Sequence, residues 1–237
     1  MAELRILREG ERSGAFNMAR DVKVAQMVQA DGIARLRLYG WRRPTLSLGY
    51  AQDSSPFDAE RLRALGVDLV RRPTGGRAVL HQHEVTYAFA ALQSALPGDV
   101  RATYLQIAQA LVSALRCLGA EVDLAGAPGS AEADANCFAQ PSWYEIEVGG
   151  RKLLGSAQVR RGGVLLQHGA LPLTLDYALW AAVFGAGDPQ AYVEGMQRRA
   201  IGLWEAVGRE IPRRAVRNAL HAAFQDWWEL RQEGEGC

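Results

Sequence analysis

Residues 70–90 read VRRPTGGRAVLHQHEVTYAFA, a short cationic turn between two apolar runs that have the composition of strands. Pro73 fixes its own φ and disfavours helix at the residue before it. Gly75 and Gly76 allow the backbone to approach a ligand at a point where a Cβ would clash. Backbone N–H groups beside arginines also suit a carboxylate or a phosphate. The stretch therefore predicts either a ligand-binding loop or a hairpin turn with solvated charges, and the residue types alone leave both open.

The composition is that of a globular protein, with 49% hydrophobic and 22% charged residues. The net charge of +1 argues against a general nucleic-acid binder. Nothing near the N-terminus resembles a signal peptide, and no apolar run approaches the ~20 residues that span a bilayer, so we expect a cytoplasmic protein without a membrane partner. A single domain is expected over residues 1–237, with residues from about 190 to 237 as a helical C-terminal extension of it.

Strands and helices alternate along the chain without an internal repeat. Gly-Gly pairs at 149–150 and 162–163 predict hairpin turns between neighbouring strands. Helices are expected over residues 13–30, 55–65 and 99–118, and again after Pro212. Meandering strands set apart from the helices indicate an α+β fold rather than a doubly wound parallel sheet.

Four local patterns predict the burial or the mobility of particular residues. The apolar set 16, 18, 19, 22, 25, 27 and 28 predicts the buried face of the first helix. Apolar residues alternating with polar ones over 34–39 predict a half-exposed strand. Cys117 lies in the apolar pattern of its helix and is expected in the core. Residues 124–135 are rich in small residues and predict a loop, which is either a mobile lid or a tolerated insertion.

Three residues in the second half of the chain have side chains suited to catalysis. Cys137 lies between a loop and a strand, where a nearby cation could activate its thiol, although a cysteine is equally a small core residue. Lys152 is one of only two lysines among 27 basic residues, and is either functional or a solvated hairpin residue. His168 is either a structural hydrogen bonder or a general base. A zinc site at His81, His83 and His168 would lack a carboxylate or cysteine at a helpful spacing.

Two blocks of the sequence resemble the superfamily of lipoate–protein ligases and the related octanoyltransferases. Residues 71–87 are similar to its RR-x-[ST]-GG-x-AV-x-H signature, and GGRKLLGSAQVRRGGVLLQHGAL, at 149–171, is similar to its second block, in which a glycine-flanked lysine precedes a GSA-type strand. The resemblance covers roughly residues 30–175. It implies a biotin/lipoate-ligase-like α+β fold, with a mixed, mostly antiparallel sheet packed by helices and a tunnel for a medium-length acyl chain.

The loop before Lys152 separates the members of this superfamily. ATP-dependent lipoate ligases usually carry an Asn-Asp type pair there, whereas this chain reads Asn136-Cys137-Phe138 and resembles the cysteine-bearing octanoyltransferases. The resemblance then implies that Cys137 is the nucleophile and that Lys152 lowers its pKa and stabilises the oxyanion. It assigns the substrate pocket to Arg72, Gly75, Gly76, Arg77, His81, Gly155, Ser156, Ala157 and His168.

The implied reaction moves octanoyl from octanoyl-acyl carrier protein, through a cysteine thioester, to a lysine of a lipoyl-carrying domain. The acceptor would be the glycine cleavage H protein or a 2-oxoacid dehydrogenase E2, and the reaction would need no cofactor or metal. Three alternatives stay open at this point: an ATP-dependent lipoate ligase, an octanoyl amidotransferase between lipoyl domains, and a non-catalytic acyl binder.

Overall fold

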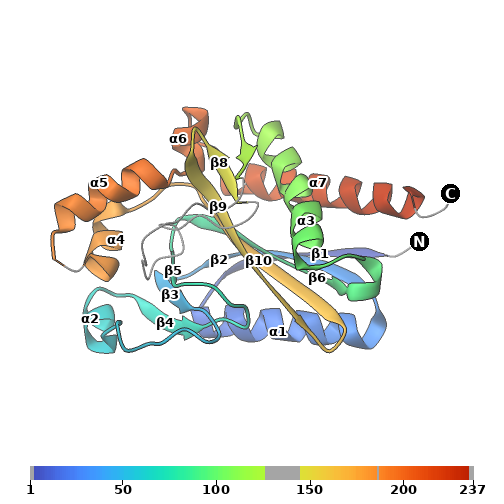
Figure 1. The fold of residues 1–237 in the computed structure, drawn as a ribbon, viewed down its shortest axis with the longest axis horizontal. Helices are drawn as coiled ribbons and strands as arrows, with labels where there is room; N and C mark the ends of the chain where they lie inside the picture. Colours follow the sequence, from blue (N-terminus) through green and yellow to red (C-terminus); the bar gives the residue numbers. More distant parts are fainter. Residues whose placement is uncertain (1–2, 126–144, 186, 235–237) are drawn as a thin grey trace.

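The computed structural model describes residues 3–125, 145–185 and 187–234 (Figure 1). Within these ranges the strands are β1 (Leu4–Arg12), β2 (Ala34–Trp41), β3 (Thr45–Leu48), β4 (Asp68–Arg71), β5 (Val79–His81), β6 (Glu84–Leu92), β7 (Asp123–Leu124), β8 (Ile146–Val148), β9 (Arg151–Arg161) and β10 (Val164–Pro172). The helices are α1 (Gly14–Asp31), α2 (Ala59–Ala64), α3 (Val100–Cys117), α4 (Tyr177–Phe184), α5 (Pro189–Arg199), α6 (Leu203–Val207) and α7 (Arg213–Gly234), with a 3-10 turn η1 (Gln93–Ala95).

The described strands form two sheets. The larger sheet has the order β1-β2-β6-β10-β9-β8-β7, and the smaller one has the order β4-β3-β5. In the larger sheet β1 runs parallel to β2, and every other neighbouring pair is antiparallel. The expected α+β fold with a mixed, mostly antiparallel sheet is therefore confirmed.

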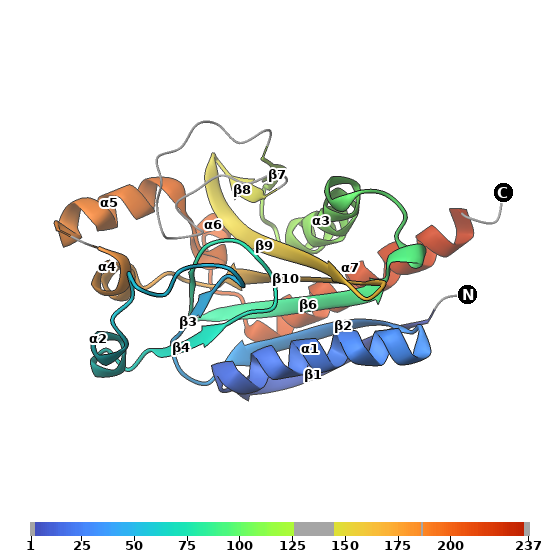
Figure 2. The same ribbon diagram turned by 60° about the horizontal axis from the view of Figure 1, so that its bottom comes forward.

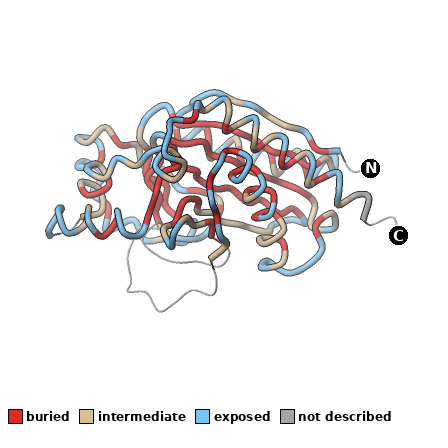
Figure 3. The backbone as a smooth tube through the Cα atoms, turned by 90° about the horizontal axis from the view of Figure 1, so that it is seen from above, coloured by how far each residue is buried: buried red, intermediate tan, exposed pale blue. Residues whose placement is uncertain are grey.

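Helices cover both faces of the larger sheet. Helix α1 packs against β2, β6 and β10 on one face, and α7 packs against β1, β2 and β6 on the other, where α3 lies beside it (Figure 2). Figure 3 shows that the buried residues concentrate in the strands between these helix layers. Helices α4 and α5 pack against the smaller sheet, where Leu46, Trp180 and Met196 share one apolar cluster. Among the helices of the described ranges, none combines the length and the hydropathy that crossing a bilayer requires.

Helix α1 begins where the sequence predicts, because the Ser13 side chain accepts a hydrogen bond from the Phe16 N–H. Its predicted buried face is right in part. Met18 and Val28 are buried as expected, but Phe16 and Val22 are 46% and 40% exposed, whereas the polar residues Asn17 and Asp21 are fully buried. The sheet beneath α1 supplies polar partners for these two side chains, and apolar periodicity alone cannot reveal such partners.

Strand β2 is buried along its whole length, so the expectation of a half-exposed strand is also wrong. The strand lies between β1 and β6 and is covered by helices on both faces. Its two arginines are buried because each has a carboxylate partner: Arg35 bonds to Asp31 at 2.5 Å and Arg37 to Asp21 at 2.6 Å.

Two smaller expectations are corrected. Cys117 is exposed rather than in the core, because the buried stripe of α3 runs through residues such as Leu111 and Leu115 and leaves the last position outside it. Helix α2 begins at Ala59 rather than at Ser55, because the Asp58 carboxylate accepts hydrogen bonds from the first backbone N–H groups of that helix.

Candidate active site

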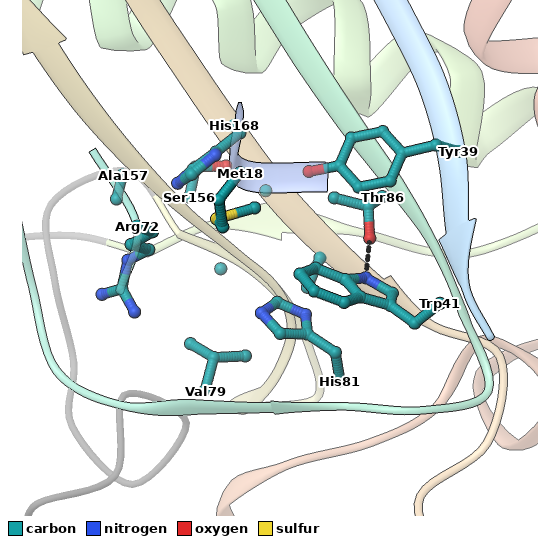
Figure 4. A pocket seen from close by; sticks show the side chains of 13 residues that line it. Met18, Tyr39, Trp41, Arg72, Val79, His81, Thr86, Ser156, Ala157 and His168 are labelled. Atoms are coloured by element: carbon teal, nitrogen blue, oxygen red, sulfur yellow. Dashed lines mark hydrogen bonds between the residues drawn. The ribbon is translucent and has the colours of Figure 1, made fainter. Parts of the chain in front are cut away.

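A pocket lies between the two sheets, under α1 (Figure 4). It holds about 430 Å³ of empty space, its open mouth included. The lining residues are Met18, Tyr39, Trp41, Arg72, Val79, His81, Thr86, Gly155, Ser156, Ala157, His168, Gly169 and Ala170. The pocket therefore brings together the two sequence blocks that resemble the ligase and octanoyltransferase superfamily.

The first block forms a loop that is held by its own arginines. Arg72 is 4% exposed and donates hydrogen bonds to the backbone oxygens of Ser47 (2.9 Å), Gly75 (2.7 Å) and Arg77 (2.6 Å). The strands on either side, β4 and β5, do not pair with each other, because β3 lies between them. The interpretation of this stretch as a hairpin with solvated charges is therefore wrong. The Arg72 guanidinium fixes the shape of the pocket wall.

The second glycine of the loop is required by its backbone conformation. Gly76 has a φ of +86°, a region that L side chains rarely adopt. Its carbonyl oxygen lies 1.9 Å from the position that a Cβ on Gly49 would take, so the two backbones approach as closely as glycine permits. Gly75 faces open space, and Arg77 is half-buried. None of Gly75, Gly76 and Arg77 is among the residues that line the pocket, so the predicted substrate contacts of these three remain a prediction.

His168 ties the loop to β10. Its Nδ1 lies 3.1 Å from the Asp21 carboxylate, and its Nε2 lies 2.6 Å from the Thr74 hydroxyl. Since a carboxylate can only accept, Nδ1 carries the proton and Nε2 accepts the hydrogen bond that Thr74 donates. Burial lowers the pKa of His168, which keeps the ring neutral in this arrangement.

The carboxylate behind His168 belongs to a buried charged cluster. Asp21 also accepts hydrogen bonds from Arg37 (2.6 Å) and from the Tyr39 hydroxyl (2.9 Å). Burial and the neighbouring Asp21 charge raise the pKa of Tyr39, so its hydroxyl stays protonated. The cluster fixes one wall of the pocket through hydrogen bonds between α1, β2 and β10.

His81 is built into the opposite wall. Its Nδ1 bonds to the Glu84 carboxylate at 2.9 Å, its Nε2 lies 2.8 Å from the Ser47 hydroxyl, and its ring stacks on Trp41 with centroids 4.0 Å apart. The indole N–H of Trp41 is in turn donated to Thr86 (Figure 4). Both ring nitrogens of His81 are thus engaged in holding the wall. No group of three or more metal-ligating side chains occurs within the residues that the structure describes.

Strand β9 carries both Lys152 and Gly155, and only Gly155 of the two lines the pocket. Lys152 is 3% exposed and its ammonium donates to the carboxylate of Glu145, so the interpretation of this lysine as a solvated hairpin residue is wrong. A Cβ added to Gly155, a residue of the pocket lining, would lie 2.8 Å from Cε and 3.2 Å from Nζ of Lys152. The glycine therefore leaves the space that the end of the lysine occupies beside the pocket.

Ser156 and Ala157 continue this wall along β9. The Ser156 hydroxyl lies 2.7 Å from the Tyr87 hydroxyl, and the Ser156 carbonyl accepts a hydrogen bond from Tyr104 at 2.7 Å. Burial raises the pKa of Tyr87 to about 12, so the phenol is neutral. Side chains of three other elements thus hold β9 at the pocket, since Gln158 of β9 also donates to Gln167 of β10 at 2.9 Å.

Sequence reasoning missed two carboxylates at this site, Asp21 and Glu145. Asp21 lies four residues after Asn17 in α1, and this i, i+4 polar pair on an otherwise apolar face was the available signal. Glu145 lies next to a strand and close to Lys152, one of the two lysines of the chain. Its burial is visible only in the folded structure. Cys137, the expected nucleophile, lies outside the described residues, as does most of the 124–135 segment.

Comparisons with known proteins agree with this arrangement. Residues 13–225 match the family described as the lipoyl protein ligase A/B catalytic domain. The chain is 40% identical over 225 residues to the octanoyltransferase LipM of Carboxydothermus hydrogenoformans, covering 92% of this chain and 84% of that protein. It is 41% identical over 247 residues to the octanoyltransferase LipM of Kyrpidia tusciae, covering 98% of this chain and 90% of that protein.

Solved structures show the same fold at lower identity. A bipartite lipoate protein ligase from Thermoplasma acidophilum superposes with a TM-score of 0.78 at 22% identity, covering 97% of this chain and 85% of that one. A lipoate-protein ligase A bound with ATP superposes with a TM-score of 0.76 at 24% identity, covering 96% of this chain and 85% of that one.

Proposed function

The chain belongs to the family of lipoyl protein ligase A/B catalytic domains, and on that premise we propose that it transfers an octanoyl group to a lysine of a lipoyl-carrying domain in lipoate biosynthesis. Relatives that are named octanoyltransferases and cover most of the chain support this reaction. The observation that carries the proposal is the position of Lys152: its buried ammonium lies beside Gly155, a residue of the mostly apolar pocket lining.

The pocket suits the tail of a medium-length acyl group. Met18, Val79, Ala157 and Ala170 give it apolar surface, and burying apolar surface stabilises a bound chain by roughly 25 cal/mol per Å². The polar side chains of the walls are bonded to one another, as in the contact of Trp41 with Thr86. An aliphatic chain can therefore enter without leaving these groups unpaired.

The reaction proceeds in two transfers. The thiolate of Cys137 attacks the thioester carbonyl of octanoyl-acyl carrier protein, forming a new carbon–sulfur bond, breaking the old one and releasing the carrier sulfur as a thiolate. The neutral acceptor lysine amine then attacks the octanoyl-cysteine thioester and forms an amide, and the proton that the nitrogen loses passes to the departing sulfur of Cys137, which regenerates the thiol. The first step exchanges one thioester for another of nearly equal energy, and the second is driven by amide formation, so neither needs ATP.

Lys152 acts in both steps. An ammonium near Cys137 lowers the pKa of the thiol and raises the thiolate fraction at neutral pH. The same ammonium stabilises the oxyanion that forms at the octanoyl carbonyl, and loss of one such donor typically costs ~10²–10³ in rate. The Arg72-braced loop at Gly75 and Gly76 places backbone beside the acyl carbonyl.

The partners follow from this chemistry. The donor is an acyl carrier protein, and the acceptor is a lipoyl domain such as the glycine cleavage H protein or a 2-oxoacid dehydrogenase E2. Support for the acceptor comes from the likeness to a Thermoplasma acidophilum structure that is described as a lipoate protein ligase and its E2 lipoyl domain. We place the reaction in the cytoplasm, where thiols such as a nucleophilic cysteine are kept reduced.

Mass spectrometry tests the proposal directly. Incubation with octanoyl-acyl carrier protein should add one octanoyl group to the enzyme, the adduct should be removed by hydroxylamine, and Cys137→Ala should abolish both adduct and transfer. Cys117→Ala serves as the matched control, because that exposed thiol lies at the end of α3, and should keep full activity. Octanoyl transfer by the Cys137→Ala variant would disprove the assignment of Cys137 as the nucleophile. ATP–pyrophosphate exchange dependent on octanoate would instead identify a ligase.

A further inference from the structure

We propose that Glu145 is a positioning residue that keeps Lys152 charged and directs its ammonium to the acyl pocket. The inference rests on the proposed role of Lys152 in octanoyl transfer. It adds a second residue to that machinery, one that acts through the lysine.

The two side chains form a buried ion pair. Glu145 is 1% exposed and Lys152 is 3% exposed, and the ammonium donates directly to the Glu145 carboxylate. Both residues are fixed by their backbones. The carbonyl of Glu145 accepts a hydrogen bond from the Ala125 N–H at 2.8 Å, and the carbonyl of Lys152 accepts one from the Ile201 N–H at 3.0 Å. The backbone that carries each of the two side chains is therefore held in place.

The direction of the lysine side chain is informative. Its direct cross-strand partner in the β8–β9 hairpin is Glu147, and directly opposed charges of unlike sign normally pair. The ammonium bonds to Glu145 instead, two residues further from the hairpin turn. The register shifts by one residue between Ile146 and Glu147, and such irregularities redirect side chains. The end of the lysine consequently lies against Gly155, in the pocket wall.

Burial explains why the lysine needs this particular partner. Removal from water disfavours the charged form of an amine and can lower a lysine pKa by up to about 3–5 units. A neutral amine could neither support a thiolate nor stabilise an oxyanion as a full charge does. A carboxylate in direct contact favours the ammonium form, so Glu145 holds the charge state that the reaction uses.

Other titratable groups lie on the elements around Lys152. Those that the structure describes include Glu147, Arg151, Tyr177, Glu194, Arg198, Arg199 and Glu205. Arg151 and Glu205 are paired with each other at 2.5 Å, and the Tyr177 hydroxyl donates to the Ala200 carbonyl at 3.3 Å. Glu147 is half-buried on the same hairpin, which makes it the matched control for a carboxylate near Lys152.

The test uses the fact that Lys23 and Lys152 are the two lysines of this chain. Protein made with 13Cε-labelled lysine should give two side-chain signals, assigned with Lys23→Arg. Lys23 is exposed and serves as the internal reference. In Glu145→Gln the pH midpoint of Lys152 should fall relative to the wild-type protein, whereas Glu147→Gln should leave it in place.

Kinetics supply the second measurement. Glu145→Gln should lower kcat for octanoyl transfer by ~10²–10³-fold, the loss expected when an oxyanion donor is removed, with little change in KM. Glu145→Asp should restore part of both kcat and the Lys152 midpoint, and it carries the test if the glutamine variant does not fold. An unchanged Lys152 midpoint in Glu145→Gln, or an equal shift in Glu147→Gln, would overturn the inference. The NMR titration does not depend on turnover, so it tests the role of Glu145 by itself. A wild-type enzyme that forms no octanoyl adduct would instead contradict the proposed function.

Discussion

Replacement of Gly155 by alanine should inactivate the enzyme while leaving its fold intact. The added methyl carbon would lie 2.8 Å from Cε of Lys152, whereas carbon–carbon contacts are optimal at about 3.5–4.0 Å. The end of the lysine must therefore move by about 1 Å. The atoms that move belong to a flexible side chain rather than to backbone, so the melting temperature should stay within a few degrees of the wild-type value.

The kinetic effect should be much larger than the effect on stability. A misplacement of about 1 Å in a catalytic group costs on the order of 10²-fold in rate, which corresponds to about 2.7 kcal/mol in the activation free energy. Initial rates of octanoyl transfer to a lipoyl domain, measured with thermal unfolding of the same preparations, give both quantities. We expect a ~10²-fold loss in kcat at nearly constant melting temperature.

Two matched glycine variants define the controls. Gly10→Ala adds a methyl group where no atom lies within 4 Å, and should leave rate and stability unchanged. Gly169→Ala would meet Tyr87 at 2.5 Å and the backbone oxygen of Gly155 at 2.8 Å, and should lower the melting temperature strongly. A Gly155→Ala enzyme within twofold of the wild-type rate would refute the placement of Lys152 at the pocket. A loss of stability equal to that of Gly169→Ala would attribute the defect to folding instead.

Two further changes test the pocket and its polar wall. Met18→Ala should enlarge the acyl pocket and raise the rate with decanoyl donors relative to octanoyl donors. The change should lower the free energy of unfolding by about 2–5 kcal/mol. An unchanged ratio of the two rates would show that Met18 does not limit the length of the acyl chain. Burial holds the pKa of His168 below its ordinary value of 6.5, so as the pH falls only the unfolded chain gains this proton. The stabilisation that neutral His168 contributes is complete above about pH 6.5 and declines below it. The free energy of unfolding, measured with denaturant between about pH 5 and 7, should therefore depend less steeply on pH in His168→Gln than in the wild type. Identical slopes would contradict this prediction.

Local signals in the sequence determined much of the backbone. Ser13 and Asp99 cap the helices that they were expected to begin, because their side chains satisfy the first free N–H groups. The Gly-Gly pairs at 149–150 and 162–163 form hairpin turns, with positive φ at all four residues. These features depend on conformations within a few residues, which is why residue types and spacing were sufficient to predict them.

The tertiary structure alone decided which charges are buried and what each one contacts. As charged residues, Arg37 and Asp21 are expected on a solvated face when only their own element is considered, yet they meet in the core because β2 is covered on both sides. Lys152 pairs with Glu145 rather than with Glu147, its cross-strand partner, and the strand register shifts between Ile146 and Glu147. Burying a charge requires a partner from another part of the chain, and the packing of the sheet and helices brings that partner into contact.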